Sequence, residues 1–232
     1  MAGNELGVDY DERLPAVPDV GVLGPAQKAV DKRPEPALPI FSILDTIDFS
    51  EHFLIIGDVG TGKSTVTPIR EYELTKGRRQ IVIREPSRAA CNALYYSLQV
   101  LHPEVSDELA VITKDTQINV GGRIKIVTDG VLLRMLAENS IHDSSIYFDE
   151  GHQMTSQLEL CMSLAKKKEA SAKNLFRVMS ATIDPKEFLV FLGISRLYQI
   201  SGRRFHVAMH VELANDIKGM FSTLSTYLNS QP

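Results

Sequence analysis

The chain has 232 residues, of which 44% are hydrophobic and 23% charged, and its formal net charge is −4. These values are typical of a globular protein, and the length suits one well-buried α/β domain with a tail or the start of another. The charge excludes nucleic-acid binding through a basic field over the whole surface, so any such binding requires a local cleft.

The cysteines and the hydropathy indicate where in the cell the protein is located. Cys91 and Cys161 stand alone, without C-x-x-C spacing, which favours buried reduced thiols over a disulfide. No apolar run approaches the length of a membrane span, and the N-terminus has no charged-then-apolar leader. We therefore expect a cytoplasmic protein without direct membrane insertion.

The N-terminal segment differs in composition from the rest of the chain. Residues 1–50 carry nine acidic and only four basic side chains, and six of the eleven prolines precede residue 40. These features predict a largely irregular, Pro-rich and acidic arm or linker over residues 1–37. An amphipathic helix is expected over 38–50, because Ile40, Leu44 and Ile47 share one helical face.

Segments typical of strands and of helices alternate after this arm. The expected strands are 53–57, 80–85, 109–113, 123–128, 145–149, 175–180, 197–200 and 205–213. The expected helices are 63–76, which Pro68 should kink or shorten, 87–99, 130–138, 156–170, 185–193 and 215–228. This alternation predicts a mostly parallel sheet with helices on both faces, which binds its ligands at the carboxyl ends of the strands.

The segment from Phe53 to Thr65 reads FLIIGDVGTGKST and fits the phosphate-binding loop pattern G-x-x-x-x-G-K-[ST]. Its glycines let backbone N–H groups surround the phosphates of a nucleotide, and the following helix directs its N-terminus at the same anion. Lys63 is expected to reach the β- and γ-phosphates, and the Ser64 hydroxyl to help hold Mg²⁺. The predicted NTP-binding residues are Gly57, Asp58, Val59, Gly60, Thr61, Gly62, Lys63, Ser64 and Thr65.

A pair of carboxylates lies at the carboxyl end of the expected strand 145–149. Asp149 and Glu150 emerge from an apolar run and precede Gly151 and His152. Asp149 can hold Mg²⁺ through water, and Glu150 can orient and deprotonate the water that attacks the γ-phosphate. A solvated acidic turn is the alternative interpretation. The predicted catalytic residues are Glu150, Asp149, Lys63 and His152, and the predicted magnesium ligands are Ser64, Asp149 and Glu150.

Five motifs in a fixed order make the chain resemble superfamily 2 helicases, in particular the DEAH-box and viral DExH branch. They are the GKST-x-x-P loop ending at Pro68, P-S-R-A-A at 86–90, TDG-x-LLR at 128–134, DEGH at 149–152 and SATID at 180–184. A G-R-R-F segment follows at 202–205. The resemblance implies that residues 38–212 form the first RecA-like motor domain, an α/β P-loop NTPase fold. Gly151 departs from the family pattern, in which alanine or cysteine is more usual.

The resemblance implies an NTPase that is stimulated by RNA or DNA and uses ATP or another NTP with Mg²⁺. The expected nucleic-acid contacts are Arg88, Thr128, Asp129 and Gly130. Arg88 and Thr128 can donate to phosphate oxygens, and Gly130 permits close backbone approach. A surface salt bridge for Arg88 and a helix-capping role for Asp129 are the alternatives. Ser180, Ala181 and Thr182 are expected to couple hydrolysis to strand movement, Ser180 and Thr182 by bonding His152. A hydrogen-bonded turn histidine without this role is the alternative for His152.

The resemblance also implies a second motor domain that supplies arginine fingers. Its motifs do not occur before Pro232, and residues 213–232 are expected to form a terminal helix or the start of that domain. Loss of such fingers costs about 10³- to 10⁵-fold in hydrolysis rate, so the 232 residues alone should bind nucleotide weakly, hydrolyse it slowly and unwind nothing. The expected partners are single-stranded or partly duplex RNA, with DNA left open, the second domain and, for a viral enzyme in the host cytoplasm, replication-complex proteins.

Two other functions remain open from the sequence. Another P-loop phosphotransferase, such as a small-molecule kinase, would explain the loop but would leave TDG-x-LLR and SATID as coincidences. A helicase-like scaffold that binds RNA or protein without catalysis would have no need of Lys63, Asp149 and Glu150. Phosphate release that rises with added polynucleotide would separate these functions from a motor.

Overall fold

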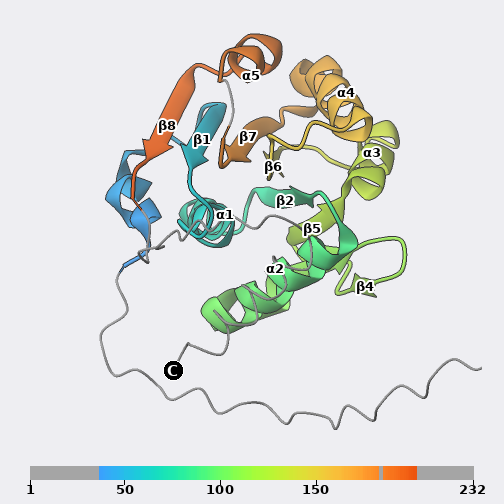
Figure 1. The fold of residues 1–232 in the computed structure, drawn as a ribbon. Helices are drawn as coiled ribbons and strands as arrows, with labels where there is room; N and C mark the ends of the chain where they lie inside the picture. The colour runs from blue at the N-terminus through green and yellow to red at the C-terminus, as the bar shows by residue number, and fades with distance from the viewer. Residues whose placement is uncertain (1–36, 183–184, 203–232) are drawn as a thin grey trace, which may run out of the picture. The chain divides into compact units, whose positions relative to one another are not determined.

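The computed structural model describes residues 37–182 and 185–202. Within these residues an eight-stranded sheet has the order β4-β3-β5-β2-β6-β7-β1-β8, and only β3 and β4 pair antiparallel (Figure 1). The mostly parallel α/β sheet is therefore confirmed. The strands are β1 (Phe53–Gly57), β2 (Gln80–Glu85), β3 (Leu109–Ile112), β4 (Gln117–Ile118), β5 (Ile124–Thr128), β6 (Ser144–Phe148), β7 (Leu175–Ser180) and β8 (Arg196–Ile200).

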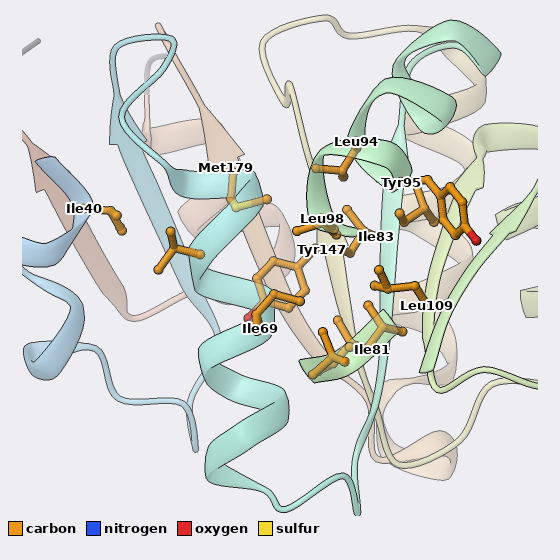
Figure 2. Close-up of a cluster of buried hydrophobic side chains, with 14 of the residues drawn as sticks. Ile40, Ile69, Ile81, Ile83, Leu94, Tyr95, Leu98, Leu109, Tyr147 and Met179 are labelled. Atoms are coloured by element: carbon orange, nitrogen blue, oxygen red, sulfur yellow. The ribbon is translucent and has the colours of Figure 1, made fainter. Parts of the chain in front are cut away.

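In the part of the chain that the structure describes, five α-helices cover the two faces of this sheet, as expected. They are α1 (Lys63–Leu74), α2 (Arg88–Leu101), α3 (Asp129–Ala137), α4 (Ser156–Ala172) and α5 (Pro185–Leu192). One buried cluster joins α1 and α2 to the sheet, with Ile69 and Leu98 packed near Ile81 and Ile83 (Figure 2). A second cluster joins α3, α4 and α5 to the other face. Alternate strand residues serve the two clusters, because successive side chains of a strand point to opposite faces.

The segment before β1 folds differently from the expected helix over 38–50. It forms two 3₁₀ helices, Pro39–Ser42 and Leu44–Thr46, which are separated by Ile43 with φ −121° and ψ −9°. Ile40, Leu44 and Ile47 are nevertheless buried, so the predicted apolar face is confirmed, whereas the predicted α-helix is wrong. The Ile40 N–H donates to the Thr61 carbonyl at 3.0 Å, which holds this segment against the phosphate loop.

Helix α1 continues beyond Pro68 and ends at Leu74, two residues before the expected end. Its buried face, which includes Val66 and Ile69, packs on the sheet and sustains the helix despite the missing N–H of proline. The two-residue strand β4, which is exposed, was not expected within the polar turn 114–122. Several predictions concern residues outside the described part of the chain. They are the strand 205–213, the helix 215–228 and the predictions made for residues 1–36, 183–184 and 203–205.

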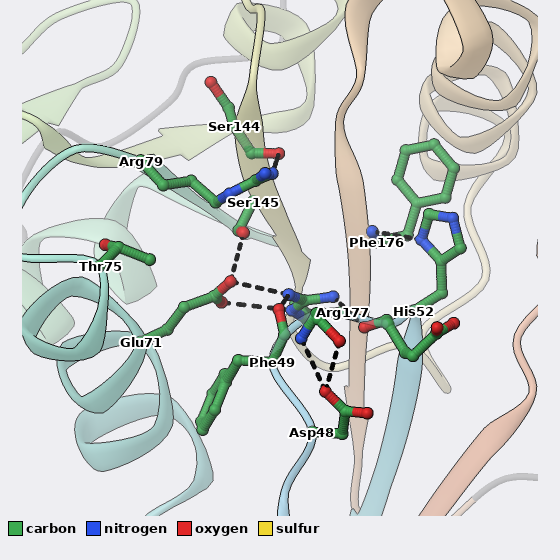
Figure 3. Close-up of polar contacts among 12 residues, drawn as sticks. Asp48, Phe49, His52, Glu71, Thr75, Arg79, Ser144, Ser145, Phe176 and Arg177 are labelled. Atoms are coloured by element: carbon green, nitrogen blue, oxygen red, sulfur yellow. Dashed lines mark hydrogen bonds and ion pairs between the residues drawn. The ribbon is translucent and has the colours of Figure 1, made fainter.

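A buried polar network ties α1 to the amino ends of the central strands (Figure 3). Glu71 on α1 and Arg177 on β7 are fully buried, and two hydrogen bonds of 2.7 and 3.2 Å join their side chains. Ser145 and Tyr147 on β6 donate to the same carboxylate at 2.5 and 2.6 Å. Arg177 also donates to the carbonyl oxygen of Phe49, at 2.7 Å. Both charges are thereby paired and hydrogen-bonded, which burial of an ion pair requires.

Candidate active site

The predicted phosphate loop lies between the carboxyl end of β1 and the N-terminus of α1. Gly62 is the N-cap of α1 and has φ 94°, a conformation that favours glycine. A Cβ at this position would lie 2.8 Å from the side chain of Ile40, so the loop also requires glycine for space. Thr61 closes the loop by donating its hydroxyl to the Asp58 carbonyl at 2.9 Å. This strand, loop and helix have the arrangement that can surround phosphate groups with backbone N–H donors.

Lys63, the first residue of α1, directs its ammonium group into this loop. Its side chain is buried, and Nζ donates to the carbonyl oxygens of Gly57 and Asp58 at 2.6 and 2.9 Å. Burial lowers the pKa of Lys63, while the charges of Asp149 and Glu150 act in the opposite direction. The lysine and the acid pair are therefore close enough to interact, although β7 lies between their strands.

Asp149 and Glu150 follow β6, where the sequence placed them. Asp149 is only 3% exposed, and its Oδ1 accepts from the Glu150 N–H at 2.8 Å. Glu150 has φ 50°, a conformation that is uncommon for a residue with a side chain and that often marks functional sites. This geometry leaves the Glu150 carboxylate part-exposed beside a buried aspartate.

Gly151 is buried where the family usually has alanine or cysteine. Its N–H donates to the Met179 carbonyl at 2.9 Å, which ties the turn of residues 149–152, here named the acid turn, to the end of β7. A Cβ at Gly151 would lie 2.9 Å from the side chain of Val178, closer than real Cβ contacts. The substitution relative to the family is therefore matched by close packing on β7.

His152 contacts both the acid pair and the end of β7. Its Nδ1 lies 3.3 Å from the Ser180 hydroxyl and 3.3 Å from a carboxylate oxygen of Glu150. The expected contact with Ser180 is thus present. Thr182 instead offers its carbonyl oxygen to the Ser180 hydroxyl at 3.4 Å, and among the described residues no hydrogen bond joins Thr182 to His152. Ala181 lies between Ser180 and Thr182, directly after β7.

Sequence reasoning missed Glu85, the last residue of β2. Glu85 is 5% exposed and forms a side-chain hydrogen bond with Asp149. Burial, and then the neighbouring charge of Asp149, raise the pKa of Glu85 to about 9, so at neutral pH the two carboxyl groups share a proton in this hydrogen bond. Two charged residues, Arg84 and Glu85, that end the apolar run 81–83 were the only signal available in the sequence.

Two of the predicted nucleic-acid elements begin at neighbouring strand ends. In the pairing of β2 with β5, Glu85 lies opposite Thr128, so the segments that start α2 and α3 leave the sheet side by side. Gly130 is exposed, and no atom lies within 4 Å of where its Cβ would be. Arg88, the first residue of α2, is exposed and forms an ion pair with Asp115. The alternative role of Arg88 in a surface pair therefore holds in this structure.

Asp129 has a different position from the one expected of a helix cap. Thr128 is the N-cap of α3, and Asp129 is the first helical residue. The Asp129 side chain is 7% exposed and forms a bidentate ion pair with Arg84, which is fully buried. The capping interpretation is therefore wrong, and the carboxylate faces the protein interior.

The residues predicted to hold Mg²⁺ can be tested against this geometry. Within residues 37–182 and 185–202, no group of three His, Cys, Asp or Glu side chains is arranged to hold a metal by itself. Ser64 at the start of α1 and Asp149 supply a hydroxyl and a carboxylate, the oxygen donors that Mg²⁺ uses together with waters and phosphate oxygens. The donor set fits an ion brought with a nucleotide.

The family model described as DEAD/DEAH box helicase matches residues 42–189 of this chain. The chain belongs to the DEAD/DEAH box helicase family. The matched residues include the phosphate loop, the acid turn and the segments that directly follow each of them. In this helicase domain the described α/β sheet is that of the first RecA-like domain of a DExH helicase.

Several relatives are similar over most of this chain. It is 28% identical over 186 residues to the probable ATP-dependent RNA helicase DHR2 of Saccharomyces cerevisiae, covering 75% of this chain and 25% of that protein. It is 27% identical over 190 residues to the human ATP-dependent RNA helicase DHX33, covering 72% and 26%. The chain thus spans about a quarter of the length of these two relatives.

A solved structure shows the same fold. The crystal structure of the Escherichia coli DEAH/RHA helicase HrpB superposes with a TM-score of 0.62 and 23% identity, over 72% of this chain and 22% of that one.

The helices described for this helicase domain include none that is both long and apolar enough to cross a membrane.

Proposed function

We propose that this chain is the NTP-binding motor domain of an RNA helicase, which couples nucleoside triphosphate hydrolysis to translocation on RNA or to its unwinding. The observation that carries the proposal is that Lys63, directed into the loop after β1, and the acid pair Asp149 and Glu150, which follows β6, lie at the carboxyl ends of parallel strands of one sheet. The names of the relatives DHR2 and DHX33, both ATP-dependent RNA helicases, support ATP and RNA as its ligands.

The chemistry follows from the side chains of the site. Lys63 would bind the β- and γ-phosphates in place of its present contacts with loop carbonyls. Ser64 and Asp149 would hold Mg²⁺, which neutralises phosphate charge when bound. Glu150 would take a proton from the attacking water, and His152 would keep this carboxylate oriented through the contact of 3.3 Å.

RNA would lie along the starts of α2 and α3. Arg88 would exchange its ion pair with Asp115 for a phosphate oxygen, and Thr128 and Gly130 would approach the backbone of the nucleic acid. Ser180, Ala181 and Thr182 would report hydrolysis to β7 through the bond between Ser180 and His152. The 232 residues alone would hydrolyse NTP slowly, because the arginine fingers of a second domain complete such sites.

The test is NTP hydrolysis by the full-length protein, measured with and without single-stranded RNA. We expect phosphate release that requires Mg²⁺ and rises when RNA is added. A rate that RNA leaves unchanged would favour another phosphotransferase, and RNA binding without any hydrolysis would favour a scaffold. Single-stranded DNA of the same sequence distinguishes the two nucleic acids, and parallel assays with ATP, GTP, CTP and UTP define the base preference.

A further inference from the structure

Arg84 on β2 is a fully buried arginine that the functional assignments above leave without a role. Its guanidinium makes a bidentate ion pair with Asp129, in which Nη2 donates to Oδ2 at 2.7 Å. Its Nη1 donates to the main-chain carbonyl of Asp149 at 2.9 Å. One rigid, planar group therefore holds one residue of the TDG segment and one residue of the acid turn.

The sheet explains why Arg84 reaches both segments. β2 lies between β5 and β6, and Arg84 pairs with Val127 on one side and Phe148 on the other. Asp149 directly follows Phe148 along the chain, and Asp129 lies two residues after Val127. The Asp149 N–H also donates to the Arg84 carbonyl at 3.1 Å, so Arg84 fixes the peptide groups on both sides of Asp149.

We infer that Arg84 is a positioning residue that transmits RNA binding at Thr128–Gly130 to the acid turn of the NTP site. This inference rests on the proposed function. When the backbone at Thr128 and Gly130 closes on a phosphate, the Asp129 carboxylate moves with it. The paired guanidinium follows, and the Asp149 carbonyl follows the guanidinium. The geometry needs an arginine, because a lysine cannot hold a bidentate carboxylate and a carbonyl together.

Arg177 provides a matched control for the burial and charge of Arg84. It is also fully buried and bidentate with a carboxylate, but its partners, the Glu71 side chain and the carbonyls of Phe49 and Glu51, belong to neither the acid turn nor the TDG segment. Arg84→Lys and Arg177→Lys therefore disturb the fold in the same manner, and only the first interrupts the path between the two segments. A purely structural role for Arg84 would make the two variants alike.

The experiment measures the NTPase of the full-length protein over a titration of single-stranded RNA. For Arg84→Lys we expect the ratio of maximal RNA-stimulated rate to basal rate to fall about fivefold or more, the lower end of typical couplings between sites. The RNA concentration that gives half of the maximal stimulation should change by less than about threefold, because Arg84 touches no RNA. For Arg177→Lys the ratio should stay within about twofold of wild type, although its melting temperature falls.

The possible results separate the inference from the proposed function. Equal stimulation of Arg84→Lys and wild type, or equal loss in Arg177→Lys, overturns the coupling and leaves the proposed function intact. A raised half-stimulating RNA concentration at an unchanged ratio also overturns it, because Arg84 would then act on RNA affinity alone. A wild type that RNA does not stimulate overturns both. If Arg84→Lys does not fold, Asp129→Asn replaces it, since the amide removes one arm of the fork and should lower the same ratio.

Discussion

The amino and carboxyl ends of the central sheet each contain a buried arginine–carboxylate pair, and the two pairs have different surroundings. At the amino end, the hydroxyls of Ser145 and Tyr147 complete the pair of Glu71 with Arg177 (Figure 3). At the carboxyl end, the pair of Arg84 with Asp129 adjoins a turn that contains further acidic groups.

This difference shows where the molecule tolerates unfavourable electrostatics. Near Arg84, two carboxyl groups, Glu85 and Asp149, share a hydrogen bond, and Glu150 has a left-handed backbone. Lys63 is buried there with a lowered pKa. Such arrangements destabilise a fold and are typical of functional sites, whereas a satisfied network holds the elements in place. We therefore expect substitutions at the carboxyl end to change activity and substitutions at the amino end to change stability.

The largest effect should follow from Glu150→Gln, at the carboxyl end. Removal of the proton-accepting carboxylate should lower the rate of NTP hydrolysis by about 10²- to 10⁴-fold, the usual contribution of a general base. Nucleotide affinity should remain, because the amide keeps the size of the side chain. Stopped-flow phosphate release and nucleotide titration measure the two quantities. Hydrolysis at the wild-type rate would exclude Glu150 as the base.

At the amino end, Arg177→Met should lower the free energy of unfolding by about 3–5 kcal/mol, because Glu71 is left buried without its partner. Urea denaturation followed by circular dichroism measures this change. The double variant Glu71→Leu/Arg177→Met is the control, and it should recover part of the loss because no unpaired charge remains. A single variant as stable as wild type would contradict the structural role of this network.

A smaller effect concerns pH and Glu85. Its folded pKa, about 9, exceeds the value of 4.5 for the free side chain, so the folded state binds the extra proton between these values. The stabilisation is complete below pH 4.5 and is lost as the pH rises through about 9. Compared with Glu85→Gln, which does not titrate, the wild type without nucleotide should therefore become progressively less stable over this range.

Urea denaturation at a series of pH values measures that difference. Glu104→Gln is the control: Glu104 is exposed, and a backbone hydrogen bond lowers its pKa. The contribution of Glu104 to the free energy of unfolding depends on pH in the opposite direction. This contribution should be lost only as the pH falls toward the pKa of Glu104 in the folded state. A constant difference between wild type and Glu85→Gln from pH 5 to 9 would show that Glu85 is already ionised in the fold.

The smallest effect on stability should come from Arg88→Ala. The ion pair with Asp115 is exposed on both sides, so its loss should cost less than about 1 kcal/mol. RNA affinity should nevertheless fall, and the slope of log affinity against log salt should decrease by about one, because one phosphate contact is removed. Fluorescence anisotropy at several salt concentrations tests this. An unchanged slope would leave Arg88 with its surface pair alone.

The sequence predicted the alternation of elements because the strands and helices carry clear periods. The runs 80–85 and 175–180 fold as β2 and β7 with the expected bounds. The segment before β1 kept its buried residues but formed 3₁₀ helices, since Ile43 leaves the helical conformation. Periodicity identifies which residues are buried more reliably than it identifies the type of a short helix.

The candidate site was predicted where its residues are contiguous in the sequence. The phosphate loop and the acid turn are short motifs, so their residues could be assigned before their spatial arrangement was known. Arg84 and Glu85 were missed because their partners are distant in sequence: Asp129 begins α3 after β5, and Asp149 follows β6. Only the order of β5, β2 and β6 brings these four side chains together, and a local pattern contains no information about that order.

The central claim is that Lys63 and Asp149 bind one Mg·nucleotide. A double-mutant cycle tests it most directly, with Mg·ADP titrated into wild type, Lys63→Ala, Asp149→Asn and the double variant. We predict that the two losses of binding free energy are not additive and differ from the sum by about 0.5–3 kcal/mol, as residues that share a partner do. Additive losses, or full affinity in Lys63→Ala, would contradict the account.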